Sequence, residues 1–156
     1  MPDILYIVVP CYNEEAVLPE TAKRLDLKLK KLIKDKTVSE KSRVMFVNDG
    51  SKDKTWEIIK ALHKDDGIFT GVNLSRNRGH QNALPAGLMT AKDKANVTIS
   101  MDADLQDDIN AADEILRRMR YRLRRTFKTQ NRYFFQKIHR RSILQGYEFF
   151  GGRNGI

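Results

Sequence analysis

The chain alternates between short apolar runs and longer segments in which apolar residues recur with helical spacing. The apolar runs are rich in β-branched residues and are bounded by polar turn residues, a pattern typical of strands buried in a parallel sheet. They predict strands at 4–9, 44–47, 69–74 and 97–100. We expect the first strand to end at Pro10, because proline has no N–H to donate to a neighbouring strand.

Three helices are predicted between these strands, beginning near Glu14, near Asp53 and after Gly79. Asn13 is the expected N-cap of the first helix, and Ser51 or Asp53 that of the second. Pro85 lies inside the third predicted helix, where a proline costs about 3 kcal/mol. We therefore expect either a kink at Pro85 or a later start of that helix.

The alternation of strands and helices predicts an α/β fold, a Rossmann-like parallel sheet flanked by helices with right-handed crossovers. In such sheets, ligands bind beyond the carboxyl ends of the strands. The loops after the first, second and fourth predicted strands are centred on Asn13, Asp49 and Asp102. If these strands are neighbours, the three loops form one site.

The charge distribution divides the chain into two parts. The net charge is +9, but residues 1–112 contribute nothing to it, since they hold 17 basic and 17 acidic residues. Residues 113–156, the C-terminal segment, hold 12 basic and 3 acidic residues and carry the whole excess. We therefore place a boundary near residue 112 and interpret the two parts separately.

Composition argues against two classes of protein. No run approaches the roughly 18 consecutive apolar residues of a transmembrane helix, and the N-terminus lacks the layout of a signal peptide, so we expect a cytoplasmic location. Cys11 is the single cysteine, which rules out an internal disulfide. Its position at the end of an apolar strand predicts a buried thiol rather than a nucleophile.

Carboxylates follow the fourth predicted strand. Asp102 and Asp104, with Gln106 after them, supply hard oxygen donors of the kind that Mg²⁺ or Mn²⁺ binds, especially where phosphates of a ligand complete the coordination shell. The alternative is an acidic loop that caps the next helix. The spacing alone leaves both interpretations open.

Four motifs occur in the order of a known family. They read PCYNE at 10–14, NDGSKDKT at 48–55, NRGHQ at 77–81 and DADLQD at 102–107. Together they resemble glycosyltransferase family 2, with the GT-A nucleotide-sugar fold. Within that family they are most similar to polyprenyl-phosphate sugar transferases, such as undecaprenyl-phosphate glucosyltransferase and dolichyl-phosphate mannose synthase. The resemblance runs from about residue 4 to residue 112, so we expect a donor-nucleotide-binding half at 1–112.

The resemblance implies a role for each matched position. A bound Mg²⁺ or Mn²⁺ would act as a Lewis acid, offsetting the charge of the leaving nucleoside diphosphate. Asp102 and Asp104 would contribute to catalysis through this metal, and no side chain is identified as a general base. The implied donor nucleotide-binding residues are Pro10, Tyr12, Glu14, Asp49, Arg78 and Asp102, and the implied metal ligands are Asp102, Asp104 and Gln106.

Several matched positions also have simpler interpretations. Glu14 suits the start of a helix, and Asp49 suits a tight turn. Arg76 and Arg78 are equally well explained as solvated loop residues, and His80 as a structural hydrogen-bonding residue.

One matched position departs from the family. Asn48 stands where a second aspartate is usual; it keeps an acceptor but loses the charge, so we expect weakened or retuned nucleotide binding.

The C-terminal segment lacks the features that the family shows after Asp108, namely a further strand, an acceptor region and, in the prenyl-phosphate branch, membrane helices. We therefore expect a fold that is incomplete at its C-terminus. Arginine and leucine favour helix up to about residue 145, and the Gly-rich end at 146–156 predicts disorder. Arginines interleaved with aromatic residues are also typical of RNA or anionic-lipid binding.

A shift of reading frame offers another explanation of this segment. Codons for residues 119–126, MRYRLRRT, can encode CDIVYGVR when they are read one base later. That string resembles the strand that usually follows in the family. We therefore hypothesise that the C-terminal segment is translated out of frame, in which case its basicity carries no functional information.

Three functions are compatible with the sequence. The first is inverting transfer of a sugar from a nucleotide-diphosphate sugar to a polyprenyl phosphate, without a nucleic-acid partner and with membrane association only through the C-terminal helices of full-length relatives. The second is a remnant that binds nucleotide sugars without transferring them. The third is nucleic-acid or anionic-membrane binding by the C-terminal segment, which truncation after Asp108 would abolish.

Overall fold

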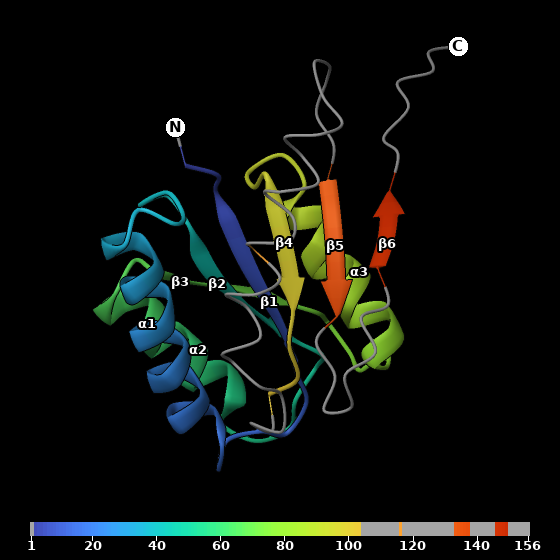
Figure 1. Cartoon of the computed structure of the whole chain (residues 1–156). Coiled ribbons are helices and arrows are strands. Elements are labelled where there is room, and N and C mark those ends of the chain that lie inside the picture. Colours follow the sequence, from blue (N-terminus) through green and yellow to red (C-terminus); the bar gives the residue numbers. More distant parts are fainter. Residues whose placement is uncertain (1, 104–115, 117–132, 138–145, 150–156) are drawn as a thin grey trace.

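A computed structural model describes residues 2–103, 116, 133–137 and 146–149 (Figure 1). The order of its elements confirms the predicted alternation of strands and helices. They are β1 (Leu5–Cys11), α1 (Leu18–Lys34), β2 (Arg43–Asn48), α2 (Thr55–Asp65), β3 (Phe69–Asn73), α3 (His80–Ala91), β4 (Val97–Ser100), β5 (Tyr133–Lys137) and β6 (Gly146–Phe149).

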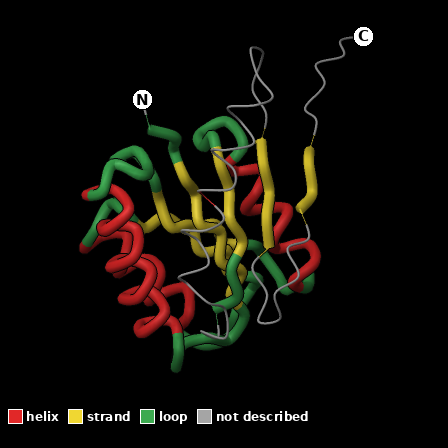
Figure 2. Tube along the Cα trace, in the orientation of Figure 1, coloured by secondary structure: helices red, strands yellow, loops and turns green. Residues whose placement is uncertain are grey.

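The strands form one sheet in the order β3-β2-β1-β4-β5-β6 (Figure 2). All neighbouring pairs are parallel except β5 and β6, which are antiparallel. β1 is central: Ile7 is opposite Val44 of β2 on one side and Ile99 of β4 on the other. The carboxyl ends of β1, β2 and β4 therefore meet at one edge, which confirms the α/β prediction.

Both faces of the sheet are covered by helices, because alternate strand residues point to opposite faces. On one face, Ile7 and Phe46 belong to a core cluster with leucines of α1 and Ile59 of α2. On the other face, Val8 belongs to a second cluster with residues of α3. Figure 1 shows α1 and α2 together on one side of the sheet and α3 on the other.

Gly87 lets α3 lie close to the sheet. A Cβ atom at this position would lie 2.6 Å from Val8 Cγ1 and 2.6 Å from Val47 Cγ2. Because these two valines are fully buried in the central strands, there is no room for them to retreat. The absence of a side chain at Gly87 thus sets the distance of α3 from the strand ends that it faces.

The prediction that Pro10 ends the first strand is wrong, since β1 continues through Pro10 to Cys11. The N–H of Met101 donates to the carbonyl of Val8, so the even-numbered peptide groups of β1 face β4. Pro10 is the next even-numbered residue, and β4 has already ended at Ser100. The N–H that proline lacks is therefore not required by a neighbouring strand.

The start of α1 also differs from the prediction. The helix begins at Leu18 after the N-cap residue Val17, and Asn13 lies outside it with a positive φ of 54°. Asn13 does not cap α1 because its main chain and side chain bond the loop after β2. Pro19 falls at the first positions of the helix, where a missing N–H costs little.

The other two helix starts agree more closely with the sequence. The N-cap of α2 is Lys54 and not Ser51 or Asp53, so that part of the prediction is wrong. Asp53, one residue earlier, still bonds the start of the helix, because its carboxylate accepts the N–H of Thr55 at 3.0 Å. α3 begins at His80, five residues before Pro85, and its start is not delayed by the proline.

The C-terminal segment contains two strands where helix and disorder were expected. β5 pairs with β4 in parallel, and β6 pairs with β5. The aromatic run at 133–135 favours a strand, and the exposed edge of β4 provides a partner, which together outweigh the helical propensity of the neighbouring arginines. Within the described residues, no helix combines the length and the apolar character that crossing a bilayer requires.

Candidate functional site

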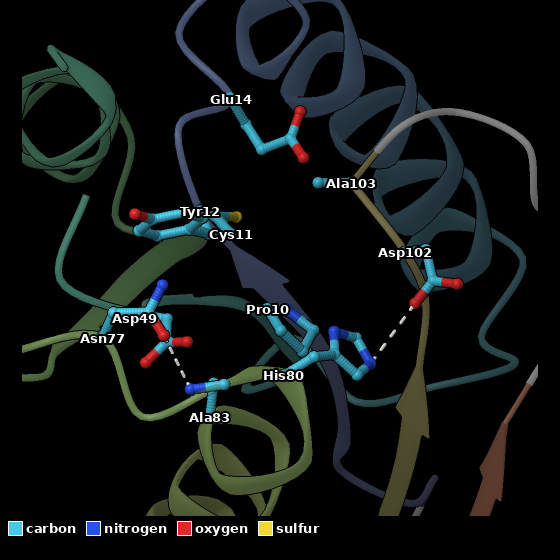
Figure 3. A pocket seen from close by; sticks show the side chains of 11 residues that line it. Pro10, Cys11, Tyr12, Glu14, Asp49, Asn77, His80, Ala83, Asp102 and Ala103 are labelled. Atoms are coloured by element: carbon cyan, nitrogen blue, oxygen red, sulfur yellow. Dashed lines mark hydrogen bonds and ion pairs between the residues drawn. The ribbon is translucent and has the colours of Figure 1, made fainter. Parts of the chain in front are cut away.

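A pocket of about 420 Å³ lies at the carboxyl ends of β1, β2 and β4 (Figure 3). Its size is within the range of about 300–1,000 Å³ that is usual for small-ligand sites. Tyr12 and Asp49 line one side and Asp102 the other, with Glu14 between them. The complete lining is Pro10, Cys11, Tyr12, Glu14, Asp49, Asn77, Gly79, His80, Ala83, Asp102 and Ala103.

The loop after β1 is tied to the loop after β2 by reciprocal hydrogen bonds. Asn13 donates its N–H to Ser51 Oγ at 3.0 Å, and Lys52 returns an N–H to Asn13 Oδ1 at 2.9 Å. Glu15 and the 53–55 turn repeat this exchange: the Glu15 N–H donates to Asp53 Oδ2, and the N–H of residue 54 donates to Glu15 Oε2. These bonds hold the segment that carries Tyr12 and Glu14 against the segment that carries Asp49.

Glu14 is fixed by its main chain. Its N–H donates to the Thr55 hydroxyl at 2.9 Å, and its carbonyl accepts the N–H of Leu18 at the start of α1. Thr55 is fully buried, so this contact is shielded from water. The Glu14 side chain, which lines the pocket, therefore projects from an anchored backbone.

Asp49 is the most deeply buried acid of the pocket, with 2% of its surface exposed. Its N–H donates to the carbonyl of Cys11, and its Oδ1 accepts the N–H of Arg78 at 2.7 Å. Asp49 thus bonds both the end of β1 and the loop before α3. Asp49 therefore does more than occupy a tight turn, which was the simpler interpretation of its position in the sequence.

Gly50 permits the close approach of these loops. It adopts a φ of +65°, which favours glycine, and a Cβ atom there would lie 2.4 Å from the Arg76 carbonyl carbon. A larger residue would push the 76–78 segment away from Asp49.

Asp102 follows β4 and faces the first turn of α3. Its Oδ1 lies 3.7 Å from His80 Nε2, and the two side chains are 27% and 48% exposed (Figure 3). Gly79, the N-cap of α3, directly precedes His80 and also lines the pocket. The positive end of a helix dipole therefore lies beside a carboxylate, in an arrangement that can accommodate both a cation and an anion.

Cys11 lines the pocket wall but is nearly inaccessible. The residue is 2% exposed, and its thiol donates to the Val9 carbonyl at 3.3 Å. Burial, reinforced by the nearby charge of Glu14, raises the pKa of the Cys11 thiol far above its usual value. The prediction of a buried thiol is therefore confirmed, and the raised pKa favours its protonated form.

The structure brings together most of the site residues predicted from the sequence. Pro10, Tyr12, Glu14, Asp49 and Asp102 all line the pocket. Arg78 touches the site through its backbone N–H to Asp49, while its side chain is exposed and is not part of the lining. The predicted metal ligands Asp104 and Gln106 lie outside the described residues.

Six of the lining residues were not predicted as part of the donor site, Asn77 and His80 among them. The sequence motifs assign Asn77 no role of its own, and they leave His80 as a structural hydrogen-bonding residue. Both lie in the NRGHQ motif, so the motif itself was the signal. Their place in the site depends on α3 crossing the face of β1 and β2, which local patterns do not specify.

Asn48, the departure from the family pattern, is absent from the pocket lining. It is buried, and its Nδ2 donates to Asn73 Oδ1 at 2.7 Å. Its Oδ1 accepts the N–H of Ser51 at 3.3 Å. The amide thus joins β2 to β3 and supports the loop beside the site.

Comparison with known proteins agrees with the geometry. The sequence matches Glycosyl transferase family 2 over residues 6–151, which includes β5, β6 and most of the C-terminal segment. The match therefore continues well beyond Asp108, where the similarity judged from motifs ends.

Individual relatives cover less of the chain. Uncharacterized glycosyltransferase YkoT of Bacillus subtilis is 42% identical over 140 residues, which are 86% of this chain and 41% of YkoT. YkcC of the same organism is 46% identical over 101 residues, or 65% of this chain and 29% of YkcC. The undecaprenyl-phosphate 4-deoxy-4-formamido-L-arabinose transferase of Pseudomonas aeruginosa PAO1 is 34% identical over 106 residues, or 67% of this chain and 29% of its own length. The chain thus spans less than half the length of these relatives.

The family match and the position of the pocket lead to the same conclusion. Four motifs from separate parts of the sequence are assembled, in their described parts, around the carboxyl ends of adjacent parallel strands. The match covers most of the chain. This protein belongs to glycosyl transferase family 2.

Proposed function

We propose that the pocket binds a nucleotide-diphosphate sugar and that the protein transfers the sugar, with inversion, to a polyprenyl phosphate. The observation that carries this proposal is the convergence of two acids, buried Asp49 and half-buried Asp102, on one pocket from separate strands. Asp49 suits a neutral, hydrogen-bonding part of the donor. Asp102 suits a cation that is held against the phosphates of the donor.

The residues of the two linked loops would bind the nucleotide. Tyr12 is 39% exposed at the mouth of the pocket, so its ring is available to pack against a base. Asp49 and Glu14 are carboxylate acceptors suited to the hydroxyl groups of a ribose or the N–H groups of a base. Their backbones are already held by hydrogen bonds, so little ordering would be required on binding.

The first turn of α3 and Asp102 would receive the diphosphate. Helix N-termini favour phosphate groups, and Gly79 and His80 border the pocket at this point. Mg²⁺ is commonly held by one or two carboxylates together with substrate phosphates. Within the described residues, no group of three or more His, Cys, Asp or Glu side chains could hold a metal ion.

The chemistry of the donor set fits Mg²⁺ or Mn²⁺ on this basis. Asp102 offers a hard oxygen donor in the pocket, and the proposed further ligands Asp104 and Gln106 follow it in the sequence. When bound, such a cation would neutralise the charge that develops on the leaving diphosphate.

The acceptor proposal is supported by the relatives and by the chemistry of the site. Relatives that are 34% identical to this chain over 106 aligned residues are named as undecaprenyl-phosphate 4-deoxy-4-formamido-L-arabinose transferases. A phosphate acceptor is already anionic and needs no general base. We place the reaction at the cytoplasmic face of a membrane, where a lipid phosphate can meet a water-soluble donor.

Donor binding and transfer are tested separately. Calorimetry with Mn²⁺ and a panel of uridine- and guanosine-diphosphate sugars should detect at least one ligand. The bound donor, radiolabelled in its sugar, is then incubated with undecaprenyl phosphate, and transfer is read as label in the lipid phase. Absence of binding across the panel would contradict the proposed function.

A second candidate is donor binding without transfer. The pocket residues given roles above would all serve the donor or its cation, and none of them is assigned to the acceptor. Saturable donor binding with no label in the lipid phase would support this candidate over the transferase.

A further inference from the structure

A buried hydroxyl of α1 contacts the acidic segment that follows β4. Thr21 lies in the first turns of α1, and its Oγ1 donates to the carbonyl of Ala103 at 2.7 Å. The two residues are 82 positions apart in the sequence and are 3% and 4% exposed. Within the described part of the chain, the donor to this carbonyl is the Thr21 hydroxyl.

The choice of partner by Thr21 is decided by geometry. The hydroxyl has one hydrogen, and the carbonyl of Val17 lies 3.1 Å away as an alternative acceptor within the same helix. The Val17 carbonyl already accepts the backbone N–H of Thr21 at 3.0 Å. The Val17 carbonyl would thus keep a donor if the Thr21 hydroxyl were removed. The Ala103 carbonyl would lose the donor that it has within the described residues.

The side chains of residues 101–103 lie alternately in the core and in the pocket. Met101 and Ala103 are buried in the cluster that also contains Leu18 and Ala22 of α1. Asp102, between them, is 27% exposed and lines the pocket. Anchoring residues on both sides of Asp102 thus hold its backbone against α1, while its carboxylate faces the site.

We propose that Thr21 is a positioning residue for Asp102, acting through the Ala103 carbonyl and touching neither donor nor metal. Ala103 directly follows Asp102, so holding the Ala103 carbonyl restrains the backbone that carries the Asp102 carboxylate. This inference rests on the proposed function, in which Asp102 helps to hold a divalent cation. It assigns to α1 a share in the metal site, although α1 contributes no ligand.

The physical basis is preorganisation. A carboxylate that binds a cation must be held near its productive position, and loss of the outer contacts that hold ligands costs about 10–100-fold in metal affinity. We therefore expect Thr21→Val, which keeps the shape but removes the hydroxyl, to weaken Mn²⁺ binding by roughly tenfold or more. Thr21→Ser keeps the hydroxyl and should bind Mn²⁺ nearly as well as the wild type.

Mn²⁺ binding to the full chain is measured by the electron paramagnetic resonance signal of free Mn²⁺, with the metal alone and with a fixed concentration of a nucleoside diphosphate. Thermal unfolding without metal is measured for each variant. Thr21→Ala, which removes the hydroxyl and favours helix, provides a second variant if the valine does not fold.

Ser42→Ala is the matched control. The Ser42 hydroxyl is fully buried and accepts the N–H of Leu5 at 2.9 Å, at the opposite end of β1 from the pocket. Its loss should lower stability and leave Mn²⁺ affinity unchanged. Wild-type affinity in both Thr21→Val and Thr21→Ala would overturn the positioning role. If the wild type itself bound no Mn²⁺ in either arm, the proposed metal site would fall, which is a different result.

Discussion

The N–H of Arg78 donates to the carboxylate of Asp49 at 2.7 Å, joining the loop before α3 to the end of β2 across 29 residues. This bond has two consequences. It fixes an acid that lines the pocket, and it draws the NRGHQ motif onto the edge of the sheet where the other motifs lie. Asp49 is therefore expected to affect both stability and ligand binding.

We predict that Asp49→Ala lowers the free energy of unfolding by about 1.5–3 kcal/mol, the usual cost of losing a buried hydrogen bond to a charged group. It should also weaken donor binding at least tenfold (about 1.4 kcal/mol) if the carboxylate contacts the nucleotide. Urea unfolding and calorimetry provide the two measurements. Unchanged donor affinity in a folded Asp49→Ala variant would remove Asp49 from the nucleotide site.

A second prediction concerns the packing of α3. Gly87→Ala places a methyl group 2.6 Å from atoms of Val8 and Val47, so it should destabilise the fold by about 1–3 kcal/mol through overpacking. Gly67→Ala is the control, because a Cβ atom there has no neighbour within 4 Å. Urea unfolding of both variants checks the prediction. Equal stabilities would show that α3 can move away from the sheet at no cost.

A third prediction concerns acid stability. Lys30 Nζ lies 2.8 Å from Asp66 Oδ2 and 2.8 Å from Asp26 Oδ1, which links α1 to the end of α2. The hydrogen bond from Lys30 lowers the pKa of the Asp66 carboxyl, with help from the N–H of Ile68. Because the side chains are partly exposed, Asp66→Asn should cost only about 0.2–1 kcal/mol at pH 7.

The pH dependence of this difference follows from the direction of the shift. A lowered pKa in the folded state stabilises the fold fully above the unfolded pKa of about 3.9, and the contribution is lost as the pH falls through the folded pKa. Wild type and Asp66→Asn should therefore differ at neutral pH and converge in acid. Unfolding curves at several pH values test this, and a difference that persisted below both pKa values would rule out the ion pair as its source.

A fourth prediction is genetic. If the C-terminal segment is out of frame, the DNA read one base later from the codon of Met119 should encode a continuous family-like strand and then apolar helices. Sequencing the locus decides the matter. A shifted frame that soon reaches a stop codon or lacks these features would contradict the hypothesis. The family match up to residue 151 would then apply to the C-terminal segment in its present reading frame.

The buried strands could be predicted from the sequence because their burial is encoded locally. β4 has the bounds that its run of β-branched residues indicates, and the loops at Asp49 and Asp102 meet as the parallel topology requires. The late start of α1 could not be predicted, because Asn13 is held by partners 38 and 39 residues away.

The remaining differences have the same tertiary origin. His80 reaches Asp102 only because α3 packs across the central strands, at a distance set by Gly87. β5 forms in a segment whose arginines favour helix, because the edge of β4 offers it hydrogen bonds. The contact between Thr21 and Ala103 joins a helix residue that lies in no motif to the DADLQD motif, 82 positions away in the sequence.

Asp102 is proposed to help bind a donor through a divalent cation. Calorimetric titration of a nucleotide-diphosphate sugar into the wild type and Asp102→Asn, each with Mn²⁺ and with EDTA, tests this role. We expect binding by the wild type with Mn²⁺, and a loss of affinity of roughly tenfold or more in EDTA and in the variant. Equal affinity in all four titrations would contradict it.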